Sequence, residues 1–230
     1  MRELPILFSG PMVRAILEGR KTVTRRVFAP EHMTWPRKGF YETHALRGGE
    51  LMTTGFGPFH PERWLSYCPY GQPGDRLWVR ETWAVQRHEP CLPHERDYQD
   101  LISPVVRYRA DGSTRRIQGD RSTGVGVYHG AVEKTRVSIH MPRWASRITL
   151  EVTGVRVERL QDISTEQAVA EGMHTFPHKG GTAYAWSADD KHGHASATGA
   201  MRWIWDQING EGAWHANPWV WVVEFRRVIP

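Results

Sequence analysis

The pattern of hydrophobic and polar positions predicts a chain built mainly from strands, with a few short helices. The clearest strand is RITLEVTGVRVERL (147–160), in which Ile148, Leu150 and Val152 share one face. After Gly154 the apolar phase shifts by one position, as it does at a β-bulge. Four further segments have the character of strands: KTVTRRVF (21–28), DRLWVRETW (75–83), VVRYRADG (105–112), which ends in an Asp-Gly turn, and PWVWVVEFRRV (218–228).

Three short helices are predicted from apolar residues at helical spacing and from residues that favour helix ends. The first, PMVRAILE (11–18), begins at a proline and is followed by a glycine. The second lies in DISTEQAVAEGM (162–173), where Ser164 and Gln167 match a capping box. The third is MRWIWDQING (201–210), which also ends at a glycine. The apolar side of the third helix consists of Met201, Ile204, Trp205 and Ile208.

Between these elements the sequence loses its regular period, and we interpret three stretches as insertions: residues 29–70, 85–130 and 174–215. Within the last of them, 174–198 has the composition of a loop. The chain has no internal repeats, and the insertions are expected to decorate a single domain over residues 1–230. Many strands, short helices and irregular crossovers indicate the α+β class, as a small β-barrel with short flanking helices and long loop insertions.

Composition narrows the class of protein without selecting a function. Lysine and arginine number 30 against 25 acidic residues, and the resulting net charge of +5 permits a nucleic-acid or nucleotide partner without requiring one. Two cysteines, Cys68 and Cys91, are too few for a disulfide framework and indicate thiols in a reducing compartment. The N-terminal apolar run is too short for a signal peptide, and no stretch approaches a membrane span. We therefore expect a cytoplasmic protein that has no membrane partner.

The segment GRKTVTRR places a lysine and two threonines at a junction between helix and strand, which makes it a candidate for catalysis. A threonine hydroxyl attacks an amide only when a base takes its proton, and a lysine of lowered pKa can be that base. The neighbours Arg20, Arg25 and Arg26 disfavour a further cation, so they are expected to lower the pKa of Lys21. Strict alternation would separate Lys21 from Thr24, so the pair requires Lys21 to lie in the turn before the strand. The alternative is a basic strand whose cations are simply solvated.

Two carboxylates are candidates to assist this pair. Glu171 is the last residue before the glycine that ends the second helix, where a negative charge faces the unfavourable end of the helix dipole. It could orient the lysine or carry a proton to a leaving amine, and the alternative is a glutamate that faces solvent. Glu81, in RLWVRETW, is a weaker candidate because it follows a half-buried strand.

The tryptophans and histidines each have two interpretations. In the third predicted helix, Trp203 and Trp205 are expected in the core. Five other tryptophans lie in or beside irregular segments, where they could stack a nucleobase or anchor long loops in the core: Trp35, Trp64, Trp83, Trp186 and Trp214. Four histidines match no defined metal-site spacing, so we expect a polar loop and no metal there: His174, His178, His192 and His194.

Three stretches in combination resemble the ASCH-domain family, in particular the longer forms encoded by bacteriophages and prophages. They are AILEGRKTVTRR, GDRLWVRETW and SIHMPRWASRITLEVTGVRVERLQDISTEQAVAEGM. The resemblance extends over about half of the chain and leaves the three insertions outside it. The resemblance implies a PUA-like β-barrel, in agreement with the strand-rich pattern. Small bacterial members of the family are amidohydrolases that remove the acetyl group from N4-acetylcytidine. Their catalytic lysine, threonine and glutamate correspond here to Lys21, Thr24 and Glu171.

The expected activity is therefore hydrolysis of an acylated cytosine nucleoside or base by these three residues, without a metal or an organic cofactor. Arg26 is expected to stabilise the oxyanion, and the remaining substrate-binding candidates are Arg20, Glu81 and Trp83. Other members of the wider fold bind RNA or modified bases, and some are ribonucleases. The alternatives are therefore a non-catalytic module that binds RNA or a modified base in the same cleft, a ribonuclease, and a phage accessory protein that keeps the fold without the site.

Overall fold

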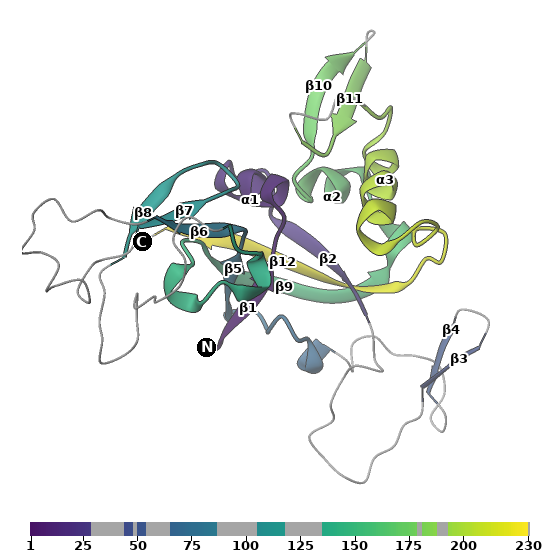
Figure 1. Ribbon diagram of the computed structural model, residues 1–230. Helices are drawn as coiled ribbons and strands as arrows, with labels where there is room; N and C mark the ends of the chain where they lie inside the picture. Colours follow the sequence, from purple (N-terminus) through teal and green to yellow (C-terminus); the bar gives the residue numbers. More distant parts are fainter. Residues whose placement is uncertain are drawn as a thin grey trace, which may run out of the picture. The chain divides into compact units, whose positions relative to one another are not determined.

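The computed structural model describes residues 1–28, 44–47, 50–53, 65–86, 105–117, 135–178, 181–187 and 193–229. The protein belongs to the α+β class, as predicted, because strands predominate and the helices are short (Figure 1). Two compact units are each assembled from separate stretches of the chain. The first comprises Met1–Gly19, Asp75–Glu151 and Arg227–Pro230, and the second comprises Arg20–Gly74 and Val152–Arg226. Among the described residues the strands pair into open sheets, and no closed barrel forms.

The first unit contains a parallel strand pair, a helix and an antiparallel sheet. β1 (Glu3–Leu7) is parallel to β5 (Arg76–Arg80), and β5 is antiparallel to the beginning of β9 (Thr149–Arg159). A second sheet has the order β6-β7-β8. The other elements of this unit are α1 (Gly10–Leu17), β6 (Trp83–Gln86), β7 (Val105–Tyr108), β8 (Thr114–Arg116), and the 3-10 helices η4 (Ser138–His140) and η5 (Arg143–Ala145).

One face of the β6-β7-β8 sheet supplies the core of the first unit. Trp83 and Tyr108 are opposite one another on β6 and β7, and both are almost completely buried. Because side chains alternate along a strand, Val85 and Val106 lie on the same face. These four residues pack with Ile117, Met141 and Ala145.

The second unit has the strand order β9-β12-β2, in which β12 (Trp219–Val228) is antiparallel to β2 (Val23–Val27). Residues 220–223 of β12 are all buried, so both faces of this strand are covered. The helices α2 and α3 pack against one another, and α3 also contacts β11 (Figure 1). The other elements are β3 (His44–Arg47), β4 (Glu50–Thr53), η6 (Leu160–Asp162), α2 (Thr165–Ala170), β10 (His174–His178), β11 (Gly181–Ala185) and α3 (Ala197–Asn209).

Most of the predicted elements form, although their bounds differ by a few residues and the predicted strand 75–83 is divided between β5 and β6. Buried positions on β9 move from Leu150 and Val152 to Val157, which is the predicted change of phase. α1 is followed by Gly19 with a φ of 77°, and α2 by Gly172 with a φ of 105°, conformations that favour glycine. β7 and β8 form a hairpin, and the predicted Asp-Gly turn lies between them.

Three features of the structure differ from the sequence prediction. Residues 174–198, expected to be a loop, contain the antiparallel strands β10 and β11, in which His178 pairs with Gly181. A two-residue connection containing glycine is the signal that the compositional argument overlooked. α3 begins four residues earlier than predicted, after Ser196, whose hydroxyl accepts a hydrogen bond from Gly199 N. Trp203 is 40% exposed rather than in the core, because it lies on the opposite side of α3 from the buried Trp205.

β1 was not predicted as an element, because its sequence ELPIL contains a proline. In the structure β1 is the edge strand beside β5. Pro5 lacks a backbone N–H, and an edge strand tolerates proline because one side of it makes no ladder hydrogen bonds.

The capping box of α2 provides a stability prediction. Ser164 Oγ accepts a hydrogen bond from Gln167 N at 3.2 Å, and Gln167 Oε1 accepts one from Ser164 N at 3.2 Å. Ser164→Ala is therefore expected to lower the free energy of unfolding by about 1 kcal/mol, measured by urea denaturation. Ser164→Thr, which keeps the hydroxyl, should retain most of this stability. Equal loss in both variants would contradict a role for the cap.

Several predictions concern residues outside the described part of the chain. These are Trp35, Trp64, Cys91, His192 and most of the insertions at 29–70 and 85–130. In the described ranges, no helix is both long enough and apolar enough to cross a membrane. The division into two compact units does not test the single-domain prediction, which stays a prediction.

Candidate functional site

Lys21 lies between the turn at Gly19 and the first residue of β2, so it precedes the strand, as the catalytic interpretation of the sequence requires. It forms an isolated antiparallel bridge with Glu171, the residue that caps the C-terminus of α2. On either side of this bridge, Thr22 N donates to Ala170 O at 3.0 Å and Thr22 O accepts from Phe225 N at 2.9 Å. The end of α2 and the strand β12 therefore fix the turn, and the Lys21 side chain is directed into the interior of the second unit.

The ammonium of Lys21 is buried and fully hydrogen-bonded. Nζ donates to Glu171 Oε2 at 2.6 Å, to Glu171 O at 2.8 Å and to Val23 O at 2.8 Å. Lys21 is 2% exposed and Glu171 is 3% exposed. Nζ also lies 5.9 Å from the centre of the Trp186 ring, which is buried as well. An ammonium has three hydrogens, so each of them has an acceptor.

Opposing effects act on the pKa of Lys21. Burial lowers the pKa most strongly, the Glu171 carboxylate raises it, and the charges of Arg26 and Arg25 lower it further. The net direction is downward, as predicted, but the main cause is loss of solvent rather than repulsion between cations. Arg20 contacts the segment that follows α2. It donates a hydrogen bond to Gly172 O, and its Nη2 lies 2.9 Å from His174 Nε2.

Arg25 holds the other oxygen of the Glu171 carboxylate. Its Nη1 lies 3.2 Å from Glu171 Oε1, while Nη2 donates to Glu158 Oε1 at 2.6 Å and to Gln167 Oε1 at 2.7 Å. The guanidinium is completely shielded from solvent. No role beyond its charge was predicted for Arg25, because its partners are 133 to 146 positions away in the sequence and only the fold brings them together.

Thr24 lies on β2 opposite Val223 and is 2% exposed. Lys21 Nζ donates to the Val23 carbonyl, which belongs to the peptide group that joins Val23 to Thr24. The lysine head group is therefore beside the backbone of Thr24. Within the described part of the chain, the Thr24 hydroxyl makes no hydrogen bond to Lys21 or to Glu171. The structure thus joins Lys21 directly to Glu171, and it leaves the threonine hydroxyl close by in sequence but not bonded to them.

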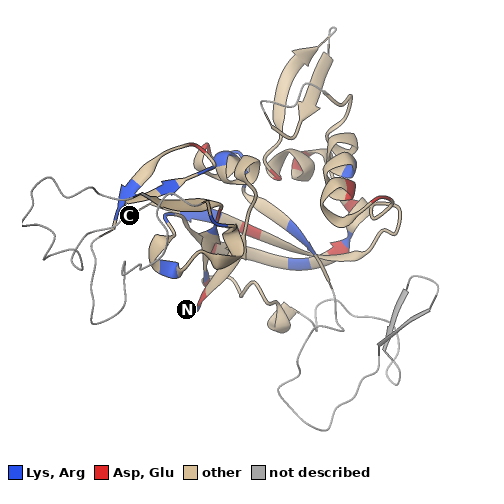
Figure 2. Ribbon diagram, in the orientation of Figure 1, with Lys and Arg blue, Asp and Glu red and all other residues tan. Residues whose placement is uncertain are grey.

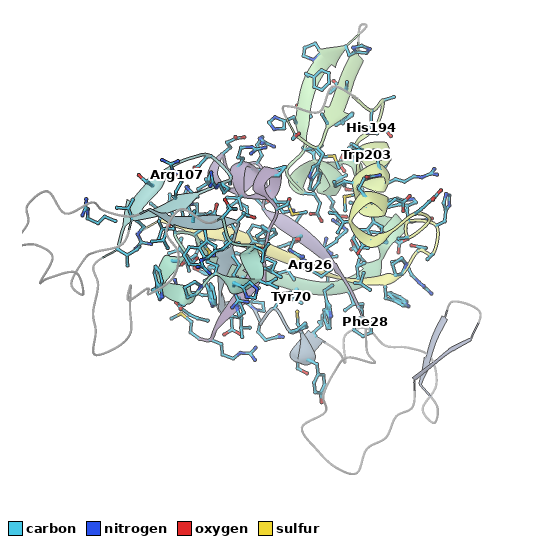
Figure 3. All side chains as sticks on the ribbon, in the orientation of Figure 1. Arg26, Phe28, Tyr70, Arg107, His194 and Trp203 are labelled. Atoms are coloured by element: carbon cyan, nitrogen blue, oxygen red, sulfur yellow. The ribbon has the colours of Figure 1, made fainter. Side chains whose placement is uncertain are left out.

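Arg26 lies beside Tyr70 (Figure 3), a residue that sequence analysis did not consider. Burial lowers the pKa of the Arg26 guanidinium, and the charges of Tyr70 and Glu171 act in the opposite direction. Burial also raises the pKa of the Tyr70 hydroxyl, against the effect of Arg26. Basic positions on β2 appear in blue in Figure 2, and an arginine keeps its charge even when it is buried. Arg26 is thus a permanent cation whose charge acts on Lys21.

The substrate-binding candidates Glu81 and Trp83 belong to the first unit. Glu81 is 1% exposed and forms a bidentate ion pair with Arg147. Arg147 Nε donates to Glu81 Oε1 at 2.8 Å, and Arg147 Nη2 donates to Glu81 Oε2 at 2.9 Å. The guanidinium of Arg147 also lies 4.1 Å from the centre of the Tyr108 ring. Trp83 meets Trp144 edge-on at 5.9 Å within the core. For Trp83 the structure agrees with the alternative that the sequence left open, namely a tryptophan that anchors irregular segments in the core.

The histidines of the third predicted insertion are spread over β10 and its surroundings. His174 lies next to Arg20, and the His194 ring lies 5.8 Å from Trp203 on α3 (Figure 3). In the ranges that the structure covers, no group of three or more potential metal ligands comes together. His192 lies outside those ranges.

Comparisons of the chain with protein-family models, with characterised proteins and with solved structures gave no match. The function is therefore inferred from the residues and their geometry.

Proposed function

We propose that the protein is an amidohydrolase that removes an acyl group from the exocyclic amine of N4-acetylcytidine or a related acylated cytosine. The observation that carries this proposal is the buried contact of 2.6 Å between Lys21 Nζ and Glu171 Oε2. These two residues are 150 positions apart, and the resemblance to the ASCH family selects both of them as catalytic. We also propose that the sheet is related to the PUA-like fold.

In this mechanism Thr24 Oγ attacks the carbonyl carbon of the amide, and Lys21 Nζ takes the hydroxyl proton. The negative charge that develops on the carbonyl oxygen is stabilised by the nearby guanidinium of Arg26. When the C–N bond breaks, Lys21 returns the proton to the departing N4 amine, and Glu171 keeps the lysine oriented throughout. Water then hydrolyses the threonine ester, which releases the carboxylic acid and restores the Thr24 hydroxyl.

The mechanism requires neutral Lys21 at the start of the reaction, and two features bear on this. Burial and the two neighbouring arginines lower the pKa of Lys21, which favours the neutral form. The Glu171 carboxylate raises the pKa and favours the ammonium. Activity is therefore expected to increase with pH as Lys21 loses its proton.

A second candidate is a module that binds a modified base or RNA without turnover. It is favoured by the three hydrogen bonds of Lys21 Nζ, because an ammonium satisfied by three acceptors is a stable structural element. Buried aromatic residues beside cations, such as Trp186 near Lys21, would serve such a module equally well.

Turnover by Thr24 variants separates these two functions. The protein is incubated with N4-acetylcytidine, and cytidine release is followed by chromatography. Thr24→Ala is expected to reduce kcat by at least about 10³-fold, because it removes the nucleophile, while Thr24→Ser should keep measurable activity. Thr24→Val, which matches the shape of threonine but has no hydroxyl, controls for packing.

Equal activity of wild type and Thr24→Ala would exclude threonine as the nucleophile. Absence of turnover on N4-acetylcytidine, together with RNA binding that weakens steeply as the salt concentration rises, would favour the non-catalytic module.

A further inference from the structure

We infer that Arg25 is a positioning residue of the proposed site, which holds the Glu171 carboxylate in the orientation that Lys21 needs. The inference rests on the proposed function and extends it to a residue for which the sequence predicted no such role. Arg25 does not have to touch the substrate, because it acts through Glu171.

The two oxygens of Glu171 have different partners. Oε2 accepts from Lys21 at 2.6 Å, and Oε1 faces Arg25 Nη1 at 3.2 Å. A carboxylate bound on one oxygen alone can rotate about its terminal torsion, which is broad for glutamate. Contact with cations on both oxygens restricts this rotation.

Arg25 is itself held on its other side. Nη2 donates to Glu158 on β9 at 2.6 Å and to Gln167 on α2 at 2.7 Å. Gln167 Oε1 is also the acceptor in the capping box at the start of α2. The guanidinium therefore links the first turn of α2 to Glu171 at its end. A lysine at this position would present one ammonium in place of the planar fork that reaches all three partners.

The ion pairs continue outward from Arg25. Glu158 Oε2 accepts from Arg156 Nε at 2.9 Å, and Arg156 also pairs with Glu224. The Arg156 side chain is 34% exposed and makes no ion pair with Glu171, so it provides a matched control. Arg156→Met removes a guanidinium from the same chain of charges but leaves both oxygens of Glu171 with their partners.

Charged groups at the end of α2 and on β2 act on Lys21. Glu171 faces it from the end of α2, and Arg25 and Arg26 face it from β2, while the neutral ring of Trp186 lies on the side of β11. Of the two arginines, Arg25 is the one that contacts Glu171 directly. Loss of Arg25 removes a positive charge near Lys21, which favours the ammonium form of Lys21.

The test compares Arg25→Met, Arg25→Lys and Arg156→Met with wild type. In Arg25→Met we expect kcat on N4-acetylcytidine to fall about 100-fold with little change in KM, because a misplaced catalytic group reduces turnover more than binding. The rise of kcat with pH should move to higher pH. Arg25→Lys should fall between Arg25→Met and wild type, guanidinium ion added to Arg25→Met should restore part of the activity, and Arg156→Met should behave as wild type.

A second measurement does not depend on turnover. The protein is labelled with 13C at the lysine ε-carbon, and the Lys21 signal is identified by its absence in a Lys21→Met variant. The titration midpoint of this signal should move to higher pH in Arg25→Met and stay at the wild-type value in Arg156→Met. If Arg25→Met fails to fold, Arg25→Lys is titrated in its place and should show a smaller shift in the same direction.

These outcomes separate the two proposals. An unchanged Lys21 midpoint in the folded Arg25 variants, or equal effects of Arg25→Met and Arg156→Met on it, would overturn the positioning role. Suppose that the wild-type protein has no activity on N4-acetylcytidine but the Lys21 midpoint still moves in Arg25→Met. This result would overturn the proposed reaction and uphold the contact between Arg25 and Glu171.

Discussion

Replacing Lys21 with methionine is expected to lower the free energy of unfolding by about 3–5 kcal/mol, even though the side chain is close in size. The substitution leaves the Glu171 carboxylate, 3% exposed, with Arg25 as its remaining cation. Two buried carbonyls, those of Val23 and Glu171, lose their ammonium donor at the same time. Equilibrium denaturation in urea at neutral pH measures the effect.

A double-mutant cycle isolates the energy of the pair. Glu171→Gln removes the charge of the partner, so Lys21→Met combined with Glu171→Gln should cost less than the sum of the two single substitutions. The matched control is Arg202→Met on the exposed face of α3, which should change stability by no more than about 0.5 kcal/mol. A loss in Lys21→Met as small as that of the control would show that the pair is not buried in solution.

The second large effect is expected at the ion pair of the first unit. Arg147→Leu should also lower the free energy of unfolding by about 3–5 kcal/mol at neutral pH, because Glu81 is 1% exposed and would lose both of its hydrogen bonds to the guanidinium. The replacement also removes the contact of Arg147 with the Tyr108 ring and its ion pair with Asp111.

The loss should depend on pH with a defined sign. Burial already raises the pKa of the Glu81 carboxyl, and Arg147 acts in the opposite direction. Without Arg147 the folded-state pKa rises further above the unfolded value, so the folded state binds the proton more tightly. The protonated form therefore stabilises the variant below the unfolded pKa, and this stability is lost as pH rises through the folded pKa.

Denaturation curves at about pH 4.5 and pH 8 test this dependence. The difference in stability between wild type and Arg147→Leu should be smaller at the lower pH. Arg143→Leu is the control, because Arg143 pairs with Glu3 at an exposed position, where such a pair contributes about 0–1 kcal/mol. A loss in Arg147→Leu that does not change with pH would contradict the role of Glu81.

Local patterns predicted much of the secondary structure. The strand patterns of β9 and β12, the capping box at Ser164 and the glycine after α1 depend on residues close together in sequence, and all of these features form. The hairpin β10–β11 was not predicted, because its composition is that of a loop and its strands are short. β1 was not predicted either, because its proline is compatible with a strand only at a sheet edge, and the sequence does not show which strand lies at an edge.

The sequence by itself determined which residues carry charge and reactive groups and where the predicted helices end, because those properties depend on neighbours a few positions away. It identified Lys21, Thr24 and Glu171 as candidates through a motif and a helix end. Only the tertiary structure decided that Lys21 is buried and bonded to Glu171, that Arg25 holds the second carboxylate oxygen, and that Trp83 lies in a core. Burial and contacts across 150 positions follow from the pairing of the end of α2 with the segment before β2, and no local pattern encodes them.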